Sequence, residues 1–258
     1  MSILDKIAAS TRIRVEKDKA ACPPEALAEK LPANALPLSF EKVLARPGMS
    51  FICEVKKASP SKGVIAEDFP YLDIARDYEA AGADALSILT EPDYFQGRDE
   101  FLTHIRREVE LPLLRKDFVV DQYQILQARA LGAAGVLLIC ALLAPAELAA
   151  FLELADSLGL SALVEAHDEG EVAMALSCGA KIIGVNNRDL RTFQVDTGNS
   201  VRLRRLVPPG ILFVSESGIT AREDVALLEE NGVDAVLIGE TLMRSPDKKQ
   251  ALNRLRGG

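Results

Sequence analysis

Charged side chains stand at the ends of several short apolar runs in this sequence. Glu54 and Lys56 lie at the end of the first such run, two positions apart. Residues two apart in an extended strand point to the same face, so this carboxylate and this ammonium are expected to share one environment. Later run ends carry Lys116, Glu165, Arg188 and Glu216.

These residue types predict proton transfer on an anionic substrate. A single glutamate or lysine at a strand end can simply be solvated. If the apolar runs are parallel strands closed into one barrel, however, charges at equivalent strand ends would converge on a common volume. Charged groups are rarely buried unless they are paired. Two lysines and three carboxylates in one pocket can tune one another's pKa values toward neutrality, as acid–base catalysis requires.

Two glycines indicate a separate phosphate site. Gly218 and Gly239 follow the last two apolar runs, and a short helix is expected to begin near Glu240. Glycine lets backbone N–H groups approach a phosphate, and a helix N-terminus adds favourable partial charge. Each glycine alone could serve a turn, but the two together predict phosphate binding.

The sequence offers little for a metal site. Its cysteines and histidines are Cys22, Cys53, Cys140, Cys178, His104 and His167. No two cysteines form a C-x-x-C pair, so neither a zinc cluster nor any other metal site is predicted. Cys53 and Cys140 lie in apolar runs and are expected to be buried small hydrophobes.

Eight apolar runs must position these residues. They cover residues 50–55, 85–89, 112–115, 135–139, 161–165, 181–185, 211–215 and 234–239. Each is nearly continuous in valine, isoleucine and leucine, which is typical of a parallel strand buried on both faces.

Amphipathic stretches separate the runs and are predicted to be helices. Residues 70–83, for example, place Tyr71, Ile74, Ala75 and Tyr78 on one face. Glycines at helix ends precede several runs, namely Gly82, Gly132, Gly179 and Gly232. The alternation predicts an α/β fold, a (β/α)8 TIM barrel. An open doubly wound sheet is the alternative, but the first strand is followed by KKASPSKG rather than a G-x-G-x-x-G loop.

Residues 1–49 are predicted to form an N-terminal helical extension to a single barrel domain spanning residues 1–258. Helical patterns cover the first 20 residues, EALAEKL and SFEKVLA, with prolines between them. This extension could plug the bottom of the barrel or cap its active-site mouth, and the sequence leaves both open.

Composition favours a soluble cytoplasmic protein. The 258 residues are 48% hydrophobic and 26% charged, with a formal net charge of −8. An acidic chain without a Lys/Arg cluster is a poor candidate for binding nucleic acid or a membrane surface. No apolar stretch is long enough to span a membrane, and the N-terminus lacks the apolar core of a signal peptide.

Motifs along essentially the whole chain resemble those of the indole-3-glycerol-phosphate synthase family. They are CEVKKASPSKG (53–63), LSILTEPDYFQG (86–97), LPLLRKDFVVDQYQI (111–125), LVEAHDE (163–169), IGVNNRDLRTF (183–193), VSESGI (214–219) and LIGETLM (237–243). The resemblance implies a lyase of tryptophan biosynthesis. The substrate would be the phosphorylated small molecule 1-(2-carboxyphenylamino)-1-deoxyribulose 5-phosphate. Ring closure, decarboxylation and dehydration would give indole-3-glycerol phosphate without a cofactor or metal.

The resemblance also implies roles for individual residues. Lys116 would be the general acid of ring closure and Glu165 its acid–base counterpart. Lys56, paired with Glu54, would bind the substrate carboxylate and assist dehydration. The remaining residues of the predicted catalytic set are Asn186 and Ser217, as orienting hydrogen-bonding groups, and Glu216, as a further carboxylate.

The same motifs predict the substrate contacts. An apolar wall for the aromatic ring would come from Pro60, Phe95, Phe118, Leu137 and Leu190. Contacts to the phosphate and glycerol chain would come from Ser59, Arg188, Gly218, Gly239 and the backbone N–H of Glu240. Glu240 departs from the family pattern, because some relatives have a small residue there. Its carboxylate must turn away from a phosphate, so only its backbone N–H is expected to bind.

Two rival functions remain at this stage. A related phosphate-binding barrel such as phosphoribosylanthranilate isomerase would need one acid–base pair and no decarboxylation. The Glu54/Lys56 pair and the N-terminal extension argue against it. A non-catalytic barrel that senses a sugar phosphate is the other, and the intact set of polar residues argues against that. Any partners are expected to be other enzymes of the tryptophan pathway.

Overall fold

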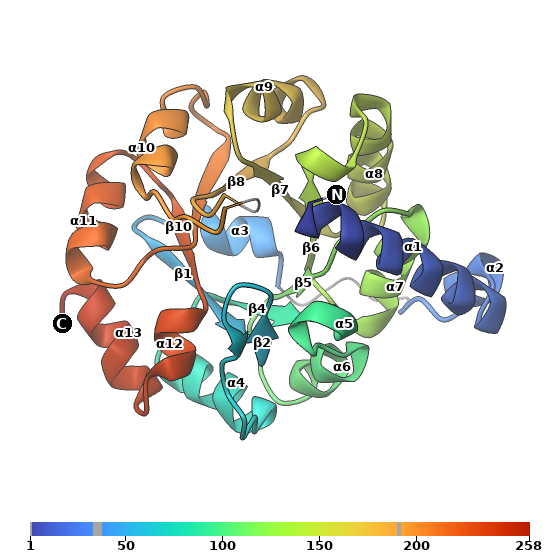
Figure 1. Cartoon of the computed structure of the whole chain (residues 1–258), viewed down its shortest axis with the longest axis horizontal. Coiled ribbons are helices and arrows are strands. Elements are labelled where there is room, and N and C mark those ends of the chain that lie inside the picture. The colour runs from blue at the N-terminus through green and yellow to red at the C-terminus, as the bar shows by residue number, and fades with distance from the viewer. Residues whose placement is uncertain (1, 33–37, 190–191) are drawn as a thin grey trace.

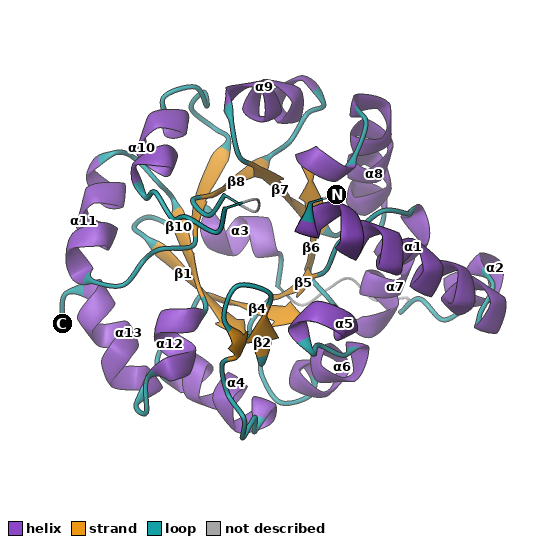
Figure 2. Cartoon of the chain, viewed as in Figure 1, coloured by secondary structure: helices purple, strands orange, loops and turns teal. Residues whose placement is uncertain are grey.

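A ring of strands lies inside a ring of helices in the computed structural model of the chain (Figure 2). The structure describes residues 2–32, 38–189 and 192–258. The strands form a closed parallel barrel in the order β1-β10-β9-β8-β7-β6-β5-β4. They are β1 (Ser50–Val55), β4 (Ala85–Leu89), β5 (Leu113–Lys116), β6 (Gly135–Ile139), β7 (Ser161–Ala166), β8 (Ile182–Asn186), β9 (Leu212–Glu216) and β10 (Ala235–Ile238). The predicted (β/α)8 TIM barrel is confirmed.

The strands differ from the predicted apolar runs by at most one residue at each end. β5 extends to Lys116, which pairs with Leu89 of β4. β8 extends to Asn186, which pairs with Glu216 at the end of β9. These polar residues therefore belong to the sheet ladder, whereas hydrophobicity alone ends each strand one residue earlier. Their backbones are fixed by the barrel, so their side chains project from rigid positions.

Helices surround the barrel as the amphipathic stretches predict. They are α4 (Tyr71–Ala80), α6 (Asp99–Arg106), α7 (Gln122–Leu131), α8 (Pro145–Ser157), α9 (Glu169–Ser177), α10 (Gly198–Arg204), α11 (Arg222–Glu230) and α13 (Lys248–Arg256). Helix α7 illustrates why these segments are helical. Asp121 caps its first turn by accepting a hydrogen bond from the N–H of Tyr123, and Gly132 ends it with φ +89°.

Two layers of apolar side chains hold these elements together. The outer layer packs the strands against the helices and includes Val136, Ile183 and Leu102. The inner layer fills the barrel itself and includes Ile52 and Leu163. Both layers consist largely of fully buried side chains, as expected for a barrel whose interior is a packed core rather than a pore.

The N-terminal extension contributes to both ends of the barrel. It contains α1 (Ile3–Ala21), α2 (Pro24–Ala28) and α3 (Phe40–Leu44). Helix α1 crosses the mouth, near the N label in Figure 1, and its residues Leu4 and Ile7 line the pocket there. Helix α3 lies at the opposite end, where its Phe40 and Leu44 are buried in the inner layer. The sequence left open whether the extension caps the mouth or plugs the bottom of the barrel. The structure shows both, because α1 covers the mouth and α3 fills the opposite end.

Ion pairs anchor α1 to the barrel. A guanidinium nitrogen of Arg14 lies 2.8 Å from Oδ1 of Asp117, the residue after Lys116. Nζ of Lys19 lies 2.7 Å from Oδ2 of Asp121, the N-cap of α7. The cap is therefore tied to the barrel directly beside a predicted catalytic lysine.

Short elements complete the barrel mouth. β2 (Ala58–Ser59) and β3 (Gly63–Val64) form an antiparallel pair that the sequence analysis did not predict. The short helices α5 (Pro92–Phe95), η1 (Cys140–Leu142) and α12 (Glu240–Arg244) follow β4, β6 and β10. The start of α12 agrees with the helix expected near Glu240.

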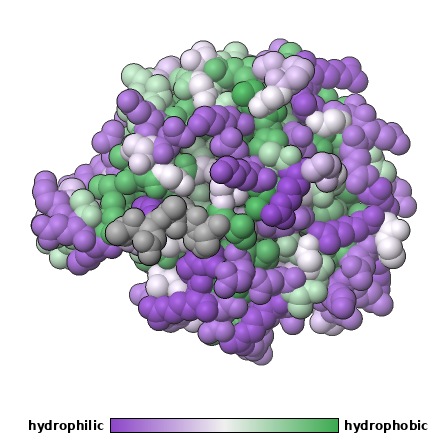
Figure 3. All heavy atoms as spheres, turned by 180° about the vertical axis from the view of Figure 1, so that it is seen from behind, coloured by the Kyte–Doolittle hydropathy of each residue, from purple (hydrophilic) through white to green (hydrophobic). Residues whose placement is uncertain are grey.

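The face opposite the mouth is seen in Figure 3. Hydrophilic side chains cover most of its rim, and hydrophobic residues show between them toward the middle. Among the described helices, none is long and apolar enough to cross a membrane.

Candidate active site

A pocket of about 540 Å³ opens at the carboxyl ends of the barrel strands. Its lining brings together residues from β1, the β2–β3 hairpin, β5, β7, β8, β9 and β10, with α1 at its edge. The sequence-predicted residues that line it are Glu54, Lys56, Ser59, Pro60, Phe95, Lys116, Phe118, Leu137, Glu165, Asn186, Arg188, Glu216, Ser217, Gly218, Gly239 and Glu240. The remaining predicted residue, Leu190, lies outside the described residues.

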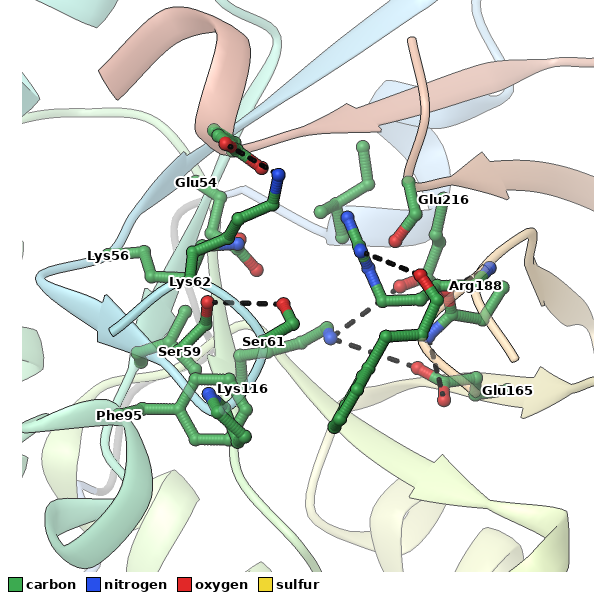
Figure 4. A pocket seen from close by; sticks show the side chains of 18 of the residues that line it. Glu54, Lys56, Ser59, Ser61, Lys62, Phe95, Lys116, Glu165, Arg188 and Glu216 are labelled. Atoms are coloured by element: carbon green, nitrogen blue, oxygen red, sulfur yellow. Dashed lines mark hydrogen bonds and ion pairs between the residues drawn. The ribbon is translucent and has the colours of Figure 1, made fainter. Parts of the chain in front are cut away.

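Lys116 occupies the centre of the charged group (Figure 4). Its Nζ lies 3.7 Å from Oε2 of Glu165 and 3.6 Å from Oε2 of Glu216. Both carboxylates are about 2% exposed, so water screens these ion pairs weakly. Nδ2 of Asn186 lies 3.4 Å from Oε1 of Glu165, the oxygen that does not pair with Lys116. One lysine is therefore placed between two buried acids.

Glu54 and Lys56 form a second pair across the pocket. Their side chains are in direct contact through Nζ and Oε2. The close approach depends on Gly239, because a Cβ at that position would overlap the Glu54 carboxylate and lie 2.8 Å from Nζ of Lys56. Gly239 was predicted to leave room for a phosphate, and the structure adds that it leaves room for this ion pair.

Burial and neighbouring charges have opposite effects on the pKa values of Lys116, Glu54 and Glu216. Burial disfavours the charge of Lys116, but Glu216, Glu165 and Glu54 outweigh it and raise its pKa above the usual value. Burial opposes ionisation of Glu54 as well, yet Lys56 and Lys116 lower its pKa. Burial raises the pKa of Glu216 to about 8, with Lys116 opposing the rise and Glu165 adding to it. The pocket thus holds a charged lysine beside a carboxyl group that titrates near neutrality.

An apolar wall lies beside the charged centre. The rings of Phe95 and Phe118 are 5.9 Å apart, in a tilted arrangement. Leu137 from β6 and the α1 residues Leu4 and Ile7 continue this surface. A flat aromatic group in the pocket would contact side chains here instead of water.

The opposite side of the pocket is polar and rich in backbone groups. Ser217 and Gly218 both have positive φ, +67° and +83°, in the turn after β9. A Cβ on Gly218 would contact Val195 and lie 3.0 Å from Thr197, so glycine is required by both conformation and space. Arg188 is held nearby, its guanidinium donating to the carbonyl of Phe193 at 3.3 Å.

The Glu240 side chain is held by two cations. Its Oε1 lies 3.0 Å from Nε of Arg244 and 3.5 Å from Nζ of Lys62. These contacts lower the pKa of Glu240 despite its partial burial. The N–H at the start of α12 remains the group that Glu240 could offer to an anion, as the sequence analysis predicted.

Comparison with known proteins identifies the family. The indole-3-glycerol phosphate synthase family model matches residues 4–255. The chain is 56% identical to an indole-3-glycerol phosphate synthase of Ruminiclostridium cellulolyticum, over 99% of each chain. It is 53% identical to one of Endomicrobium trichonymphae, over 98% of this chain and 99% of the relative.

The chain belongs to the indole-3-glycerol phosphate synthase family. It is an enzyme, a decarboxylating lyase of tryptophan biosynthesis, as the motif resemblance implied. Phosphoribosylanthranilate isomerase and a non-catalytic sensor are set aside by this match. The synthase also shares its fold with more distant barrels. One is 3-hexulose-6-phosphate synthase from Salmonella typhimurium, with a TM-score of 0.66, 13% identity, and coverage of 81% of this chain and 97% of that one.

Thiamine phosphate pyrophosphorylase from Pyrococcus furiosus has a TM-score of 0.61 and 18% identity, covering 85% of this chain and 96% of that one. At these identities the likeness concerns the barrel fold alone. The details of the site therefore come from the geometry of this synthase itself.

Sequence reasoning missed several residues around the pocket of this synthase. Lys62 lines it from the β2–β3 hairpin, and Asp117 lines it while binding Arg14. Leu4 and Ile7 line it from α1, and their apolar spacing at the start of a helix was the one available signal. His167 lies behind Glu165, two residues further along the chain, and its position in LVEAHDE gave no indication of this contact.

Metal ligands are sparse in the described part of the synthase. No cluster of three or more histidine, cysteine, aspartate or glutamate side chains could hold a metal ion there. Cys53 and Cys140 are free and buried, as predicted.

Proposed function

We propose that this pocket converts 1-(2-carboxyphenylamino)-1-deoxyribulose 5-phosphate to indole-3-glycerol phosphate, with Lys116 as the general acid of ring closure. The observation that carries the proposal is the buried position of Lys116 between Glu165 and Glu216, with an apolar wall on one side and a glycine-lined polar region on the other. This arrangement matches a substrate that is aromatic at one end and phosphorylated at the other.

Ring closure needs a proton at the substrate ketone oxygen. The aromatic carbon that bears the carboxylate attacks the ketone carbon, and Lys116 donates a proton to the oxygen, which becomes a hydroxyl group. The intermediate carries positive charge on its former aromatic system. Glu165 supplies preorganised negative charge beside it, which lowers the barrier. Loss of carbon dioxide then restores the aromatic ring.

Dehydration completes the reaction. The new hydroxyl leaves with one proton as water, and one proton is removed from the ring system to form the indole. Glu165 is the acid–base partner in these transfers. Lys56, held by Glu54, first binds the substrate carboxylate and then assists departure of the hydroxyl.

Substrate orientation would come from the two sides of the pocket. Phe95, Phe118, Leu137, Pro60 and Leu190 would hold the aromatic ring. The phosphate and glycerol chain would contact Ser59, Arg188, Gly218, Gly239 and the N–H of Glu240. Asn186 and Ser217 would orient the reacting groups through hydrogen bonds, and Glu216 would serve as a further site carboxylate.

The charge of Lys62 supports adding it to the phosphate contacts. Its side chain is 43% exposed, and its Nζ lies 3.5 Å from Oε1 of Glu240. This ion pair is long and open to solvent, so the ammonium can turn from Glu240 toward an incoming phosphate dianion. Arg244 remains to hold Glu240 away from the phosphate.

The cellular setting follows from this function. The enzyme would act in the cytoplasm on a small phosphorylated metabolite, with other tryptophan-pathway enzymes as its partners. The unpaired state of the described cysteines is in keeping with a reducing compartment.

One assay tests the proposed reaction. Purified protein is mixed with the carboxyphenylamino substrate, and indole fluorescence and released carbon dioxide are followed together. We expect both products in equal amounts, with strong loss in the Lys116→Met variant. Fluorescence without matching carbon dioxide, or no product from folded protein, would contradict the proposal.

A further inference from the structure

His167 lies in a line of alternating charges behind Glu165. It follows β7, and α9 begins two residues later. Its Nε2 is 3.4 Å from Oε1 of Glu165, and its Nδ1 is 3.1 Å from Oε2 of Glu171. The same Glu171 oxygen accepts a hydrogen bond of 2.7 Å from the backbone N–H of His167, which fixes the carboxylate against the ring.

Each ring nitrogen of His167 thus faces a carboxylate. A neutral imidazole has one N–H and one lone pair, so it would turn a lone pair toward one of the two acids. An imidazolium carries an N–H on both nitrogens, so it presents positive charge and a donor to each of the two acids. Nε2 is also buried and makes no hydrogen bond to any described residue, and its ion pair is with Glu165.

We propose that His167 is a positioning residue of this synthase, which bridges Glu171 and Glu165 as an imidazolium and holds Glu165 ionised and oriented for proton transfer. The proposal rests on the proposed acid–base role of Glu165. Oε1 of Glu165 is held by Asn186 and His167, at 3.4 Å each, while Oε2 faces Lys116. Without His167, the buried carboxylate would keep a single cationic neighbour and could rotate away from the reacting atoms.

The groups around His167 favour its charged form. Burial opposes the charge, but the hydrogen bond to Glu171 and the charge of Glu165 raise the pKa of His167 to about 9, and Glu216 contributes further. Asp168 is turned toward the backbone of α9, where it accepts from the N–H of Glu171 at 2.9 Å. Lys116, beyond Glu165, is the opposing positive charge.

Two further neighbours are neutral. Sγ of Cys140 in η1 donates to the carbonyl of Glu171 at 3.6 Å, and burial raises the pKa of this thiol to about 12. Nδ2 of Asn199 in α10 donates to the carbonyl of His167 at 3.2 Å. The backbone of His167 is therefore fixed independently of its ring, so ring substitutions should leave the local fold intact.

Nuclear magnetic resonance can test the charge directly, because the chain has only two histidines. Spectra of protein with 15N-labelled histidine, compared with those of His104→Asn, assign the ring of His167. We expect both nitrogens of His167 to be protonated at pH 7.5 and to titrate near pH 9, and Glu171→Gln to lower that titration point. Titration at or below pH 6.5, or no response to Glu171→Gln, would overturn the proposal.

Kinetics test the link to Glu165. We expect His167→Gln to lower kcat about 10- to 100-fold, because Glu165 loses the positive charge that favours its ionised form, with KM nearly unchanged. His104→Gln, the matched change at a ring that contacts Tyr71 outside the pocket, should leave kcat unchanged. His167→Leu, which also removes the N–H donors that the glutamine amide keeps, serves as the second variant, with kcat at or below that of His167→Gln.

A double variant separates this proposal from the proposed function. If His167 acts through Glu165, His167→Gln should add little further loss in a Glu165→Gln background. Full additivity, or a rise in KM with unchanged kcat in the folded single variant, would overturn the positioning role alone. A Glu165→Gln variant with parent-like kcat would instead overturn the proposed role of Glu165.

Discussion

Nζ of Lys116 lies 3.6 Å from Oε2 of Glu216, and the two side chains share a buried space at the centre of the barrel mouth. The other oxygen of Glu216 has no hydrogen-bond partner among the described residues and lies over Gly184, where a Cβ would overlap it. An acid held this way is poorly solvated when ionised, which is why its pKa is raised even beside a lysine.

Glu216→Gln should change how stability depends on pH. In the folded protein the pKa of Glu216 is raised to about 8, whereas the ordinary pKa of a glutamate is 4.5. Between these pH values the unfolded chain has lost this proton and the folded chain has not, so rising pH favours unfolding. One proton corresponds to about 1.4 kcal/mol per pH unit. In the parent, the free energy of unfolding measured by urea titration should therefore fall with pH between about pH 4.5 and 8. In Glu216→Gln this fall should be smaller, by up to about 1.4 kcal/mol per pH unit.

Glu230→Gln provides the control for this measurement. Glu230 is an exposed carboxylate on α11, away from the pocket. Its replacement should leave the pH slope of the parent in place. Identical slopes for the parent and Glu216→Gln would show that Glu216 is ionised at neutral pH in the folded protein.

Gly218→Ala tests the phosphate region. Its φ of +83° disfavours alanine, and the added Cβ would contact Val195. We expect a lower Tm and the loss of thermal protection by inorganic phosphate, which the parent should show because a ligand of the folded state raises Tm. Gly179→Ala is the matched control, since its φ is +89° and open space surrounds it.

The control variant carries the backbone strain without touching the pocket. It should lose about as much Tm from strain alone and keep phosphate protection. If phosphate protects neither the parent nor Gly179→Ala, the phosphate assignment is wrong.

Two truncations separate the role of α1 at the barrel mouth from the role of α3 at the opposite end. Removing residues 1–21 deletes α1 with its pocket residues Leu4 and Ile7, so we expect a folded barrel with a raised KM. Removing residues 1–45 also deletes Phe40 and Leu44, which are at most 1% exposed. Core truncations of this kind cost about 2–5 kcal/mol each, so cooperative unfolding should be lost in the longer deletion.

All eight apolar runs lie beyond residue 45, so the sequence alone predicts that a barrel lacking residues 1–45 stays folded. The burial of Phe40 and Leu44 argues against that prediction. Circular dichroism melting curves of both truncations decide the question. A cooperative transition in the longer deletion near the parent Tm would show that α3 is dispensable.

Much of the barrel could be predicted because its signals are local. Eight buried parallel strands leave eight apolar runs, and the helix ends leave glycines such as Gly82 and Gly132, both with positive φ. The role of α3 could not be predicted in this way. Its amphipathic pattern shows that Phe40 is buried, but the partner surface is made by strands far along the chain.

In the candidate site, too, some contacts could be predicted from local sequence signals and others could not. Placing Lys116, Glu165 and Glu216 together needed only the rule that parallel strand ends meet at one edge of a barrel. The contacts of Lys62 and His167 depend on loop geometry. Lys62 reaches Glu240 because residues 58–64 fold back as a hairpin, and no motif in KKASPSKG encodes that distance.

Lys56→Met should affect binding and a late step together. The variant removes the cation that contacts Glu54 and would meet the substrate carboxylate. We expect KM to rise and dehydration to slow, while the ring-closing step in a single turnover stays close to the parent rate. Rapid-quench analysis that finds ring closure itself slowed as strongly as dehydration would contradict this division of roles.

Lys116 holds the central catalytic role, and single-turnover kinetics of Lys116→Met test it most directly. Methionine keeps an apolar stem and removes the acid, and general acid catalysis is worth about 10²–10⁴-fold. With substrate bound in the pocket, ring closure should slow by at least that lower factor. Lys116→Arg should not restore it, because a planar guanidinium is the wrong shape for the place of a compact ammonium. Ring closure at near the parent rate in Lys116→Met would contradict the account and assign the acid to Lys56.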